Sequence, residues 1–434
     1  ENSFFLSGFN PIIYSHPVIA VVPAEGASCI LVHALRDDHA RASAWVEDIR
    51  LYGAWSTKVT MGPNWLDALQ EILKEKGVSE ATIGFEGDWL PANLLATFQA
   101  RFPNARLKDV SDIVQHARLV KDAQQIRDAR IAAHLAGMDA AIRALAGGAS
   151  ERGVAVAAQN EMNRVWLEQY PDIEVCDFGS LEGGVHNGLW CWCLTGERVL
   201  INTDNPSLRV PQPGEIAMIL IWANCNGVHA ENERSVAVGT LPAERQAAYD
   251  AILEIRAKVQ PHIRPGVTGA QLYQLARQEY IRLGLERYVP GRIGHGLGLG
   301  AHEHPSLDSR STEVLEPGML ITFEPNIRVP EWGGLQHSDT LLITEDGFEF
   351  LTTTPRDFLA VPRWAPRGPH GGGRAAVSPG CATLVRHFFP WFAMTACGID
   401  FGTSNSTVGW MRPGQDVLLT LEDGKPTLPS AIFF

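Results

Sequence analysis

The sequence predicts an α+β protein in which a smaller α/β domain precedes a larger domain of long helices and strands. The first observation is that short apolar runs alternate with segments of helical spacing up to about residue 120, a pattern typical of an α/β domain. The second is that long helical stretches follow this region and lead into strand-like runs, further helices and closing strands. We therefore expect two folded domains, one after the other.

The N-terminal region carries the signals of a small α/β domain, which we place at residues 1–120. Runs rich in Val, Ile and Leu predict strands, and apolar residues at helical spacing predict a helix. Two of the strands flank a turn signal at Pro23–Gly26. The predicted strands are 18–22, 27–32 and 81–86, and the predicted helix is 65–76.

The larger domain, which we place at residues 121–362, is predicted from blocks of helical and strand-like sequence. A pair of glycines, Gly147 and Gly148, ends its first helical stretch. The predicted helices are 123–146, 153–168, 244–260 and 269–284, with strand-like runs from 175 to 238 and closing strands from 295 to 351.

The character of the chain changes after Pro362. Residues 363–393 begin with a Pro/Gly/Arg-rich stretch without periodicity, which predicts a disordered linker. In the remaining segment, 394–434, the run from Gly398 to Thr407 resembles the first phosphate-binding strand and turn of the actin-like and heat-shock chaperone ATPases. Only about 40 residues of such a domain are present, too few to close a nucleotide site. We interpret the segment as a fragment joined by accident.

Composition narrows the class of protein. With 434 residues, 45% hydrophobic and 20% charged, the chain has an ordinary globular composition. A net charge of −13 argues against a nucleic-acid binder and favours cationic or zwitterionic small substrates. No apolar run is long enough to span a bilayer, so no membrane partner is expected. Seven cysteines, an odd number, predict no disulfide framework and favour the cytoplasm, although a start at Glu1 leaves a removed signal peptide open.

The strongest candidate for a functional site combines two histidines on a glycine-rich segment with a glutamate in an apolar strand. Histidine and glutamate both bind divalent metals and move protons, and glycines let the backbone approach what the imidazoles face. The spacing fits neither nucleotide-binding fingerprint. The segment runs Gly294-His295-Gly296-Leu297-Gly298-Leu299-Gly300-Ala301-His302-Glu303-His304-Pro305, and the glutamate is Glu324.

This segment, together with residues 315–325, resembles the catalytic half of the family of creatinase, prolidase, aminopeptidase P and methionine aminopeptidase. The resemblance runs from about Ser3 to about Pro362. It implies a pita-bread catalytic domain, in which helices back a curved antiparallel sheet, after a creatinase/prolidase-type N-terminal domain. It also implies a homodimer. The fold alone does not give the reaction, because one fold hosts several chemistries.

The resemblance implies a broken dinuclear metal site. The metallopeptidase branches hold two divalent ions with two aspartates, one histidine and two glutamates. In this chain the first aspartate falls on Leu220, Trp222 or Asn224, and the last glutamate falls on Ser338. Because Asp339 is next to Ser338 on a strand, its side chain is expected on the other face. The remaining positions are filled by Glu231, His295 and Glu324.

The metal-free creatinase branch offers a closer match at two places. The triplet Glu233-Arg234-Ser235 follows Gly227 at the spacing of a Glu-Arg-Thr triplet in creatinase. The run from Ile201 to Asp204 resembles the strand before the creatinase catalytic histidine, whose position falls on Thr203 or Asp204. An aspartate serves as a base if burial or like charge raises its pKa. The alternatives for the base are His186 and His229.

The charges agree with a cationic substrate. Glu231 and Glu233 are two residues apart, so on a strand both side chains point to one face. With Glu324 they would repel one another in a buried pocket, and a guanidinium, amidinium or ammonium group would relieve this repulsion. Trp222 would supply an apolar or cation–π wall. Arg234 is expected to pair with a carboxylate.

We expect a creatinase-like hydrolase that cleaves a C–N bond of a small guanidino or amidino compound, without a metal or other cofactor. A first alternative is a metal-dependent Xaa-Pro aminopeptidase or dipeptidase with one Mn, Zn or Fe ion on Glu231, His295, Glu324 and Asp339. A second is an inactive binding module. The predicted catalytic residues are His295, His302, Glu233, Glu324 and Asp204, and the predicted substrate-binding residues are Glu231, Trp222 and Arg234.

Overall fold

The computed structural model describes residues 1–12, 15–175, 178, 188–201 and 204–362, together with strands at 396–401, 405–412, 415–418 and 427–429. The chain forms two compact units, Glu1–Trp364 and Ala365–Phe434. The first unit contains the helices and strands that position the candidate site.

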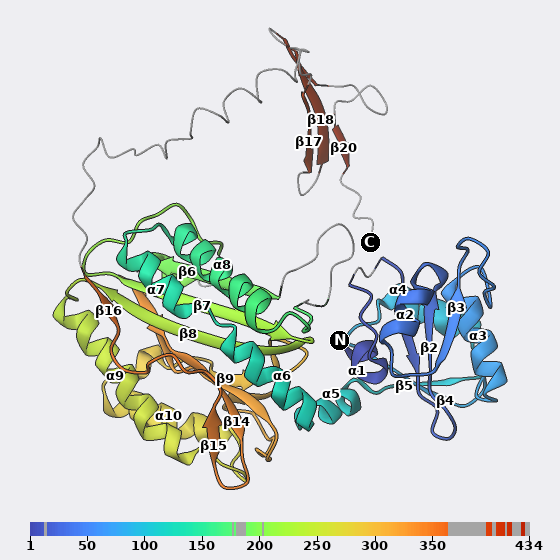
Figure 1. The fold of residues 1–434 in the computed structure, drawn as a ribbon, viewed down its shortest axis with the longest axis horizontal. Helices are drawn as coiled ribbons and strands as arrows, with labels where there is room; N and C mark the ends of the chain where they lie inside the picture. The colour runs from blue at the N-terminus through green and yellow to red at the C-terminus, as the bar shows by residue number, and fades with distance from the viewer. Residues whose placement is uncertain are drawn as a thin grey trace. The chain divides into compact units, whose positions relative to one another are not determined.

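The N-terminal part of the first unit has the predicted α/β character, with helices around two small sheets (Figure 1). The central helix α3 (Trp65–Glu75) begins where the Asn64 side chain accepts hydrogen bonds from two backbone N–H groups, an N-cap that this residue type favours. Its apolar face packs against β2 and includes Leu69 and Ile72. The other elements are α1 (Asn2–Ser7), β1 (Ile19–Val21), β2 (Cys29–His33), α2 (Asp37–Ser43), β3 (Asp48–Tyr52), β4 (Thr82–Phe85), α4 (Ala92–Arg101), β5 (Arg106–Asp109) and α5 (Ser111–Leu119).

The first predicted helix of the larger domain is two helices in the structure. The chain bends at Gly137, where an added Cβ would lie 2.4 Å from the carbonyl oxygen of Ala158. Because glycine has no Cβ, the backbone at this point lies close to the third helix, and the helix after the break packs against that helix. These helices are α6 (Ala123–His134), α7 (Met138–Ala146) and α8 (Glu151–Gln169), and the later pair is α9 (Ala243–Val259) and α10 (Gly269–Arg282).

A nine-stranded sheet forms the centre of the larger domain, in the order β10-β9-β11-β14-β8-β7-β6, with β15 beside β14 and β16 beside β8. All its pairs are antiparallel except β8–β16. The strands are β6 (Leu189–Thr195), β7 (Ile216–Cys225), β8 (Val228–Val238), β9 (Arg292–Gly296), β10 (Glu303–Asp308), β11 (Leu320–Phe323), β14 (Ser338–Ile343), β15 (Phe348–Phe350) and β16 (Ala360–Val361). A separate hairpin consists of β12 (Asn326–Val329) and β13 (Gly333–Gln336).

Helices back this sheet and leave one face for the site. On β7, Ile219, Ile221 and Ala223 belong to a buried cluster with α7 and α8, which lie along β6–β8 in Figure 1. Side chains alternate along a strand, so Leu220 and Trp222 point to the other face. The α+β class predicted from the sequence is confirmed by this arrangement.

The second unit contains a four-stranded antiparallel sheet, in which β18 lies between β17 and β19 and also pairs with β20. The strands are β17 (Ala396–Phe401), β18 (Asn405–Arg412), β19 (Gln415–Leu418) and β20 (Thr427–Pro429). The predicted linker, residues 363–393, lies outside the described residues. The domain boundaries and the resemblance of residues 394–434 to ATPases stay predictions.

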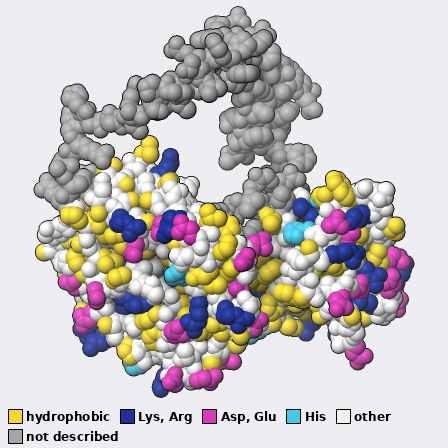
Figure 2. Space-filling view, in the orientation of Figure 1, with side chains coloured by type: hydrophobic (Ala, Val, Ile, Leu, Met, Phe, Trp, Pro, Cys, Tyr) yellow, Lys and Arg dark blue, Asp and Glu magenta, His cyan; other side chains and the backbone are white. Residues whose placement is uncertain are grey.

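The surface of the first unit carries both signs of charge. Figure 2 shows Lys and Arg side chains interspersed with Asp and Glu side chains over its visible face. Within the described part of the chain, no helix combines the length and apolar character needed to cross a membrane. The cytoplasmic location and the homodimer stay predictions.

Candidate active site

The pairing of β7 with β8 determines which side chains share the face of the sheet that carries the candidate site. Trp222 lies opposite Glu231, and Leu220 lies opposite Glu233. On the other side of β8, Ser338 of β14 also lies opposite Glu233. Residues directly opposite each other on antiparallel strands share a face. The two glutamates therefore stand on one face between neighbours from both flanking strands, as their spacing predicted.

Three glutamates converge there. Each of Glu231, Glu233 and Glu324 offers a carboxylate oxygen, and the three atoms lie within 4.8 Å of one another. Their exposed fractions are 1%, 1% and 6%. Glu324 directly follows β11, whose last residue, Phe323, lies opposite Asp339. The turn after β11 thus brings Glu324 to the carboxylates of β8.

Burial and mutual repulsion give the three carboxyl groups different pKa values. Burial, followed by the charge of Glu231, raises the pKa of Glu324 to about 7. Burial and both neighbouring carboxylates raise the pKa of Glu233 well above its usual range. Burial alone would also raise the pKa of Glu231, but His295 and the hydroxyl of Ser338 lower it overall. Glu231 is therefore the carboxylate that is most readily ionised.

His295 presents a ring nitrogen to these carboxylates. Its Nδ1 lies 2.9 Å from the carbonyl oxygen of Gly296, and a carbonyl can only accept, so Nδ1 carries the hydrogen. Nε2 lies 3.4 Å from Oε2 of Glu231 and 3.8 Å from Oε1 of Glu324. Burial would lower the pKa of His295, but the charges of Glu324 and Glu231 raise it overall. In the neutral ring, Nε2 presents a lone pair to these carboxylates. Among the described residues, no group makes a hydrogen bond with this buried Nε2 atom.

His302 stands at the rim of the same cluster. Its ring centroid is 4.3 Å from that of His295 and 5.9 Å from that of Trp222. Although part of the side chain is exposed, desolvation and the neighbouring His295 lower the pKa of His302 to about 4. The ring is therefore neutral near pH 7 and can both donate and accept a hydrogen bond.

Neighbouring donors orient the carboxylates. The Trp222 indole Nε1 donates to Oε2 of Glu231 at 2.7 Å, and the Ser338 hydroxyl donates to its other oxygen. The Gln336 amide donates to Glu233 at 2.5 Å and lies 3.4 Å from an oxygen of Glu324. The sequence analysis did not select Gln336. Its position two residues before Ser338, at the spacing that keeps a strand residue on one face, was the available signal.

Arg234 and Asp339 lie on the other face of the sheet. Arg234 is fully buried and its Nη2 lies 2.7 Å from Oδ1 of Asp339, while Nη2 of Arg256 lies 2.5 Å from Oδ2. Arg234 pairs with a carboxylate as expected, but its predicted substrate contact is wrong. Asp339 is also wrong as a candidate metal ligand, because two arginines from the helix side neutralise it.

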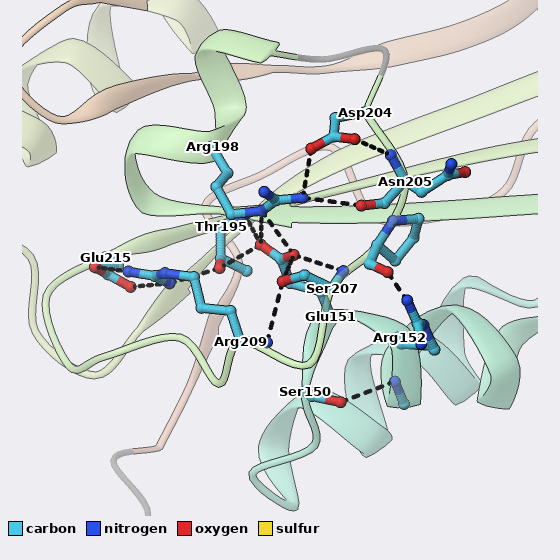
Figure 3. Close-up of polar contacts among 12 residues, drawn as sticks. Ser150, Glu151, Arg152, Thr195, Arg198, Asp204, Asn205, Ser207, Arg209 and Glu215 are labelled. Carbon is cyan, nitrogen blue, oxygen red and sulfur yellow. Dashed lines mark hydrogen bonds and ion pairs between the residues drawn. The ribbon is translucent and has the colours of Figure 1, made fainter. Parts of the chain in front are cut away.

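The carboxylate of Asp204 is paired with residues outside the cluster of glutamates. Its carboxylate lies 3.0 Å from Nη2 of Arg198 and accepts a hydrogen bond from the backbone of Asn205, and its side chain is 48% exposed (Figure 3). Arg198 in turn contacts the fully buried Glu151, which also accepts hydrogen bonds from Thr195 and Ser207. These contacts tie the segment to the start of α8. They do not support the prediction that Asp204 is the catalytic base.

The two other candidate bases differ in what the structure describes. His186 and Thr203 lie outside the described residues. His229 is buried on β8, and its Nδ1 lies 3.1 Å from the carbonyl oxygen of Gly298. This contact orients the ring of His229 toward the glycine-rich loop.

The donor set suits one divalent ion. Ligand atoms of Glu231, His295 and His302 lie within 4.8 Å of one another, as do those of Glu231, Glu233 and Glu324. The buried Nε2 of His295 makes no hydrogen bond among the described residues and is the kind of group that a metal satisfies. By the resemblance to the family, two of the five ligand positions of an ion pair fall on Ser338 and on Leu220, Trp222 or Asn224, none of which offers a carboxylate. The residues present therefore fit a single ion better than two.

Sequence comparison places the chain among peptidases. Residues 124–345 match the metallopeptidase family M24, and residues 1–120 match the creatinase/prolidase N-terminal domain. An uncharacterized peptidase, YqhT, of Bacillus subtilis is 30% identical over 279 residues, which cover 64% of this chain and 75% of the relative. The Xaa-Pro dipeptidase of Pyrococcus furiosus is 28% identical over 295 residues, which cover 68% of this chain and 78% of the relative.

Solved structures share the fold. The Xaa-Pro dipeptidase from Bacillus anthracis has a TM-score of 0.69 at 22% identity, covering 83% of this chain and 92% of that one. The X-Pro aminopeptidase from Thermotoga maritima has a TM-score of 0.67 at 21% identity, covering 83% and 93%. The predicted pita-bread domain and its smaller N-terminal domain are confirmed. The chain belongs to metallopeptidase family M24 and is a hydrolase of C–N bonds.

Proposed function

We propose that the protein is a metal-dependent peptidase for small Xaa-Pro substrates that works with one divalent ion. The observation that carries this proposal is the buried Nε2 of His295, which has no hydrogen bond among the described residues and faces the carboxylates of Glu231 and Glu324. The names of the relatives support the substrate class, because several are Xaa-Pro dipeptidases. The expectation of a metal-free enzyme is not supported by them.

Glu231, His295 and Glu324 would hold the ion. A divalent ion bound there supplies Lewis-acid polarisation of a substrate carbonyl and a hydroxide nucleophile near neutral pH. His302, with its lowered pKa, stays neutral and donates a hydrogen bond to the carbonyl or to the departing nitrogen. Trp222, in edge contact with Trp192 at 5.1 Å, offers an apolar surface for a substrate ring.

A second candidate function is the creatinase-like reaction on a guanidino or amidino compound such as creatine or ectoine. The observation that favours it is the convergence of three buried glutamates beside Trp222, since a cationic group would relieve their repulsion. It lacks an identified base, because Asp204 pairs with Arg198. We therefore rank it below the metal-dependent reading.

Elemental analysis and turnover on the full chain separate these readings. We would purify the protein without chelator, measure bound Mn, Zn and Fe, and assay Xaa-Pro dipeptides beside guanidino and amidino compounds. About one equivalent of metal with chelator-sensitive dipeptide cleavage supports the proposal. Turnover of guanidino compounds by metal-free protein supports the second candidate. Turnover of neither class by metal-loaded protein favours an inactive binding module.

A further inference from the structure

The side chain of Glu233 lies between residues of two neighbouring strands that carry no carboxylate. Its neighbour across β7 is Leu220, and its neighbour across β14 is Ser338. By the resemblance to the family, Ser338 falls on the position of one missing ligand, and Leu220 is one of three residues on which the other falls. The carboxylate of Glu233, on the middle strand and 1% exposed, thus stands between two side chains that carry no carboxylate.

We propose that Glu233 is the fourth ligand of a single metal ion, beside Glu231, His295 and Glu324. The inference rests on the proposed function. With three carboxylates and one imidazole, the set is rich in oxygen and suits a hard divalent ion such as Mn²⁺. The chain would then have exchanged two peripheral carboxylates for one central carboxylate, and a dinuclear site for a mononuclear one.

The distances allow this coordination. Oxygens bound to one ion at about 2.1 Å lie within about 4.2 Å of each other. The carboxylate atoms of Glu231, Glu233 and Glu324 already lie within 4.8 Å of one another. Nε2 of His295 lies 3.4 Å from Glu231 and 3.8 Å from Glu324, so two of the three carboxylates are within reach of an ion bound to this nitrogen.

A second observation points independently to a ligand. The imidazole of His295 is 1% exposed, and its Nε2 faces the glutamates without a hydrogen bond from any described residue. The lone pair on Nε2 and the carboxylate oxygens are the donors that one ion would satisfy together.

The surrounding contacts orient the proposed ligands. Gln336 donates to Glu233 and lies within 3.4 Å of Glu324, so one amide links the two carboxylates. Trp222 and Ser338 each donate a hydrogen bond to Glu231 and so orient its carboxylate. Hydrogen bonds from residues that do not themselves bind the metal are a regular part of metal sites, where they orient each ligand.

Calorimetric titration of Mn²⁺ into the chelator-stripped full chain tests the proposal. We expect the natural protein to bind one ion and Glu233→Gln, which keeps the shape but removes the charge, to bind at least about 10-fold more weakly. The matched control is Glu316→Gln, which removes a charge from an exposed position of the same domain and should leave the affinity unchanged. Melting curves verify that each variant is folded.

Glu233→Asp provides a second variant in case the glutamine variant does not fold. It keeps the charge on a shorter arm, so we expect a smaller Mn²⁺-induced rise in Tm than in the natural protein. Equal affinity for Mn²⁺ in folded Glu233→Gln and the natural protein would overturn the inference and leave the proposed function intact. Absence of Mn²⁺, Zn²⁺ and Fe²⁺ binding to the natural protein would overturn both.

Discussion

At the residue scale, the protein contains two kinds of buried carboxylate. Asp339 is neutralised by Arg234 and Arg256 on the helix side of the sheet. The glutamates on the other face contact the imidazole of His295, at 3.4 Å from Glu231, and Arg292, at 3.5 Å from Glu324. Buried charge without full compensation is costly. We therefore expect the first kind to stabilise the fold and the second kind to bind a cation.

We expect Asp339→Asn to lower the free energy of unfolding by about 3–5 kcal/mol, because it leaves two buried arginines without their counter-charge. Urea unfolding followed by circular dichroism measures the loss. Glu345→Gln, which removes a charge from an exposed turn, should change the same quantity by about 0.5 kcal/mol or less. A loss below about 1 kcal/mol in Asp339→Asn would contradict the structural role.

His302→Gln should separate catalysis from metal binding. The ring touches His295 and Trp222 at the rim and is neutral near pH 7, so its role is to exchange hydrogen bonds with substrate. We expect kcat on an Xaa-Pro dipeptide to fall by about 100-fold or more. The affinity for Mn²⁺, measured by calorimetry, should change by about threefold or less. An equal loss in both quantities would make His302 a ligand.

At the element scale, strand periodicity accounts for what the sequence could and could not predict. Alternation on a strand was enough to place Glu231 and Glu233 on one face. The positions of Leu220 and Ser338 beside Glu233 depend on pairing between strands far apart in sequence, and no local pattern gives that register. The break at Gly137 was missed for a similar reason, because its cause is a contact with α8.

The loop that carries His302 is held by the next residue. Glu303 pairs with Arg118 at the end of α5, and its Oε2 lies 3.3 Å from Nζ of Lys121. It also accepts a hydrogen bond of 2.7 Å from the backbone of Gly300. Its side chain is 9% exposed. The rim of the site thus depends on charges supplied by Arg118 and Lys121, on either side of the boundary between the two predicted domains.

The stability that Glu303 supplies should depend on pH. Burial would raise the pKa of Glu303, but Lys121 and Arg118 hold it below the usual value. A carboxyl group with a lowered pKa in the folded state stabilises that state above its unfolded pKa, about 4.3, and the stabilisation is lost as pH falls through the folded pKa. In urea unfolding, Glu303→Gln should be about 3 kcal/mol less stable at pH 7, and this difference should shrink below about pH 4. A difference that stays constant from pH 7 to pH 3.5 would exclude the ionised pair as its source.

At the scale of the whole molecule, the family was predictable because two local motifs, around His295 and around Glu324, are specific to it. The reaction was harder to predict, because it depends on which positions of an inherited site have lost their carboxylates. Ser338, with Leu220, Trp222 or Asn224, predicted that the dinuclear site is broken, which stays a prediction. The convergence of Glu231, Glu233 and Glu324 is a matter of geometry, which the sequence does not contain.

The last prediction concerns the second unit. The buried apolar clusters described for the first unit are formed by its own residues, up to Val361, and the chain divides into compact units at Trp364. Removal of residues 365–434 should therefore leave the main thermal transition within about 2 °C and the affinity for Mn²⁺ unchanged, because a compact unit with its own core folds by itself. Differential scanning calorimetry and titration of the two proteins measure both quantities. A fall in Tm beyond about 5 °C would mean that the first unit depends on the second for its stability.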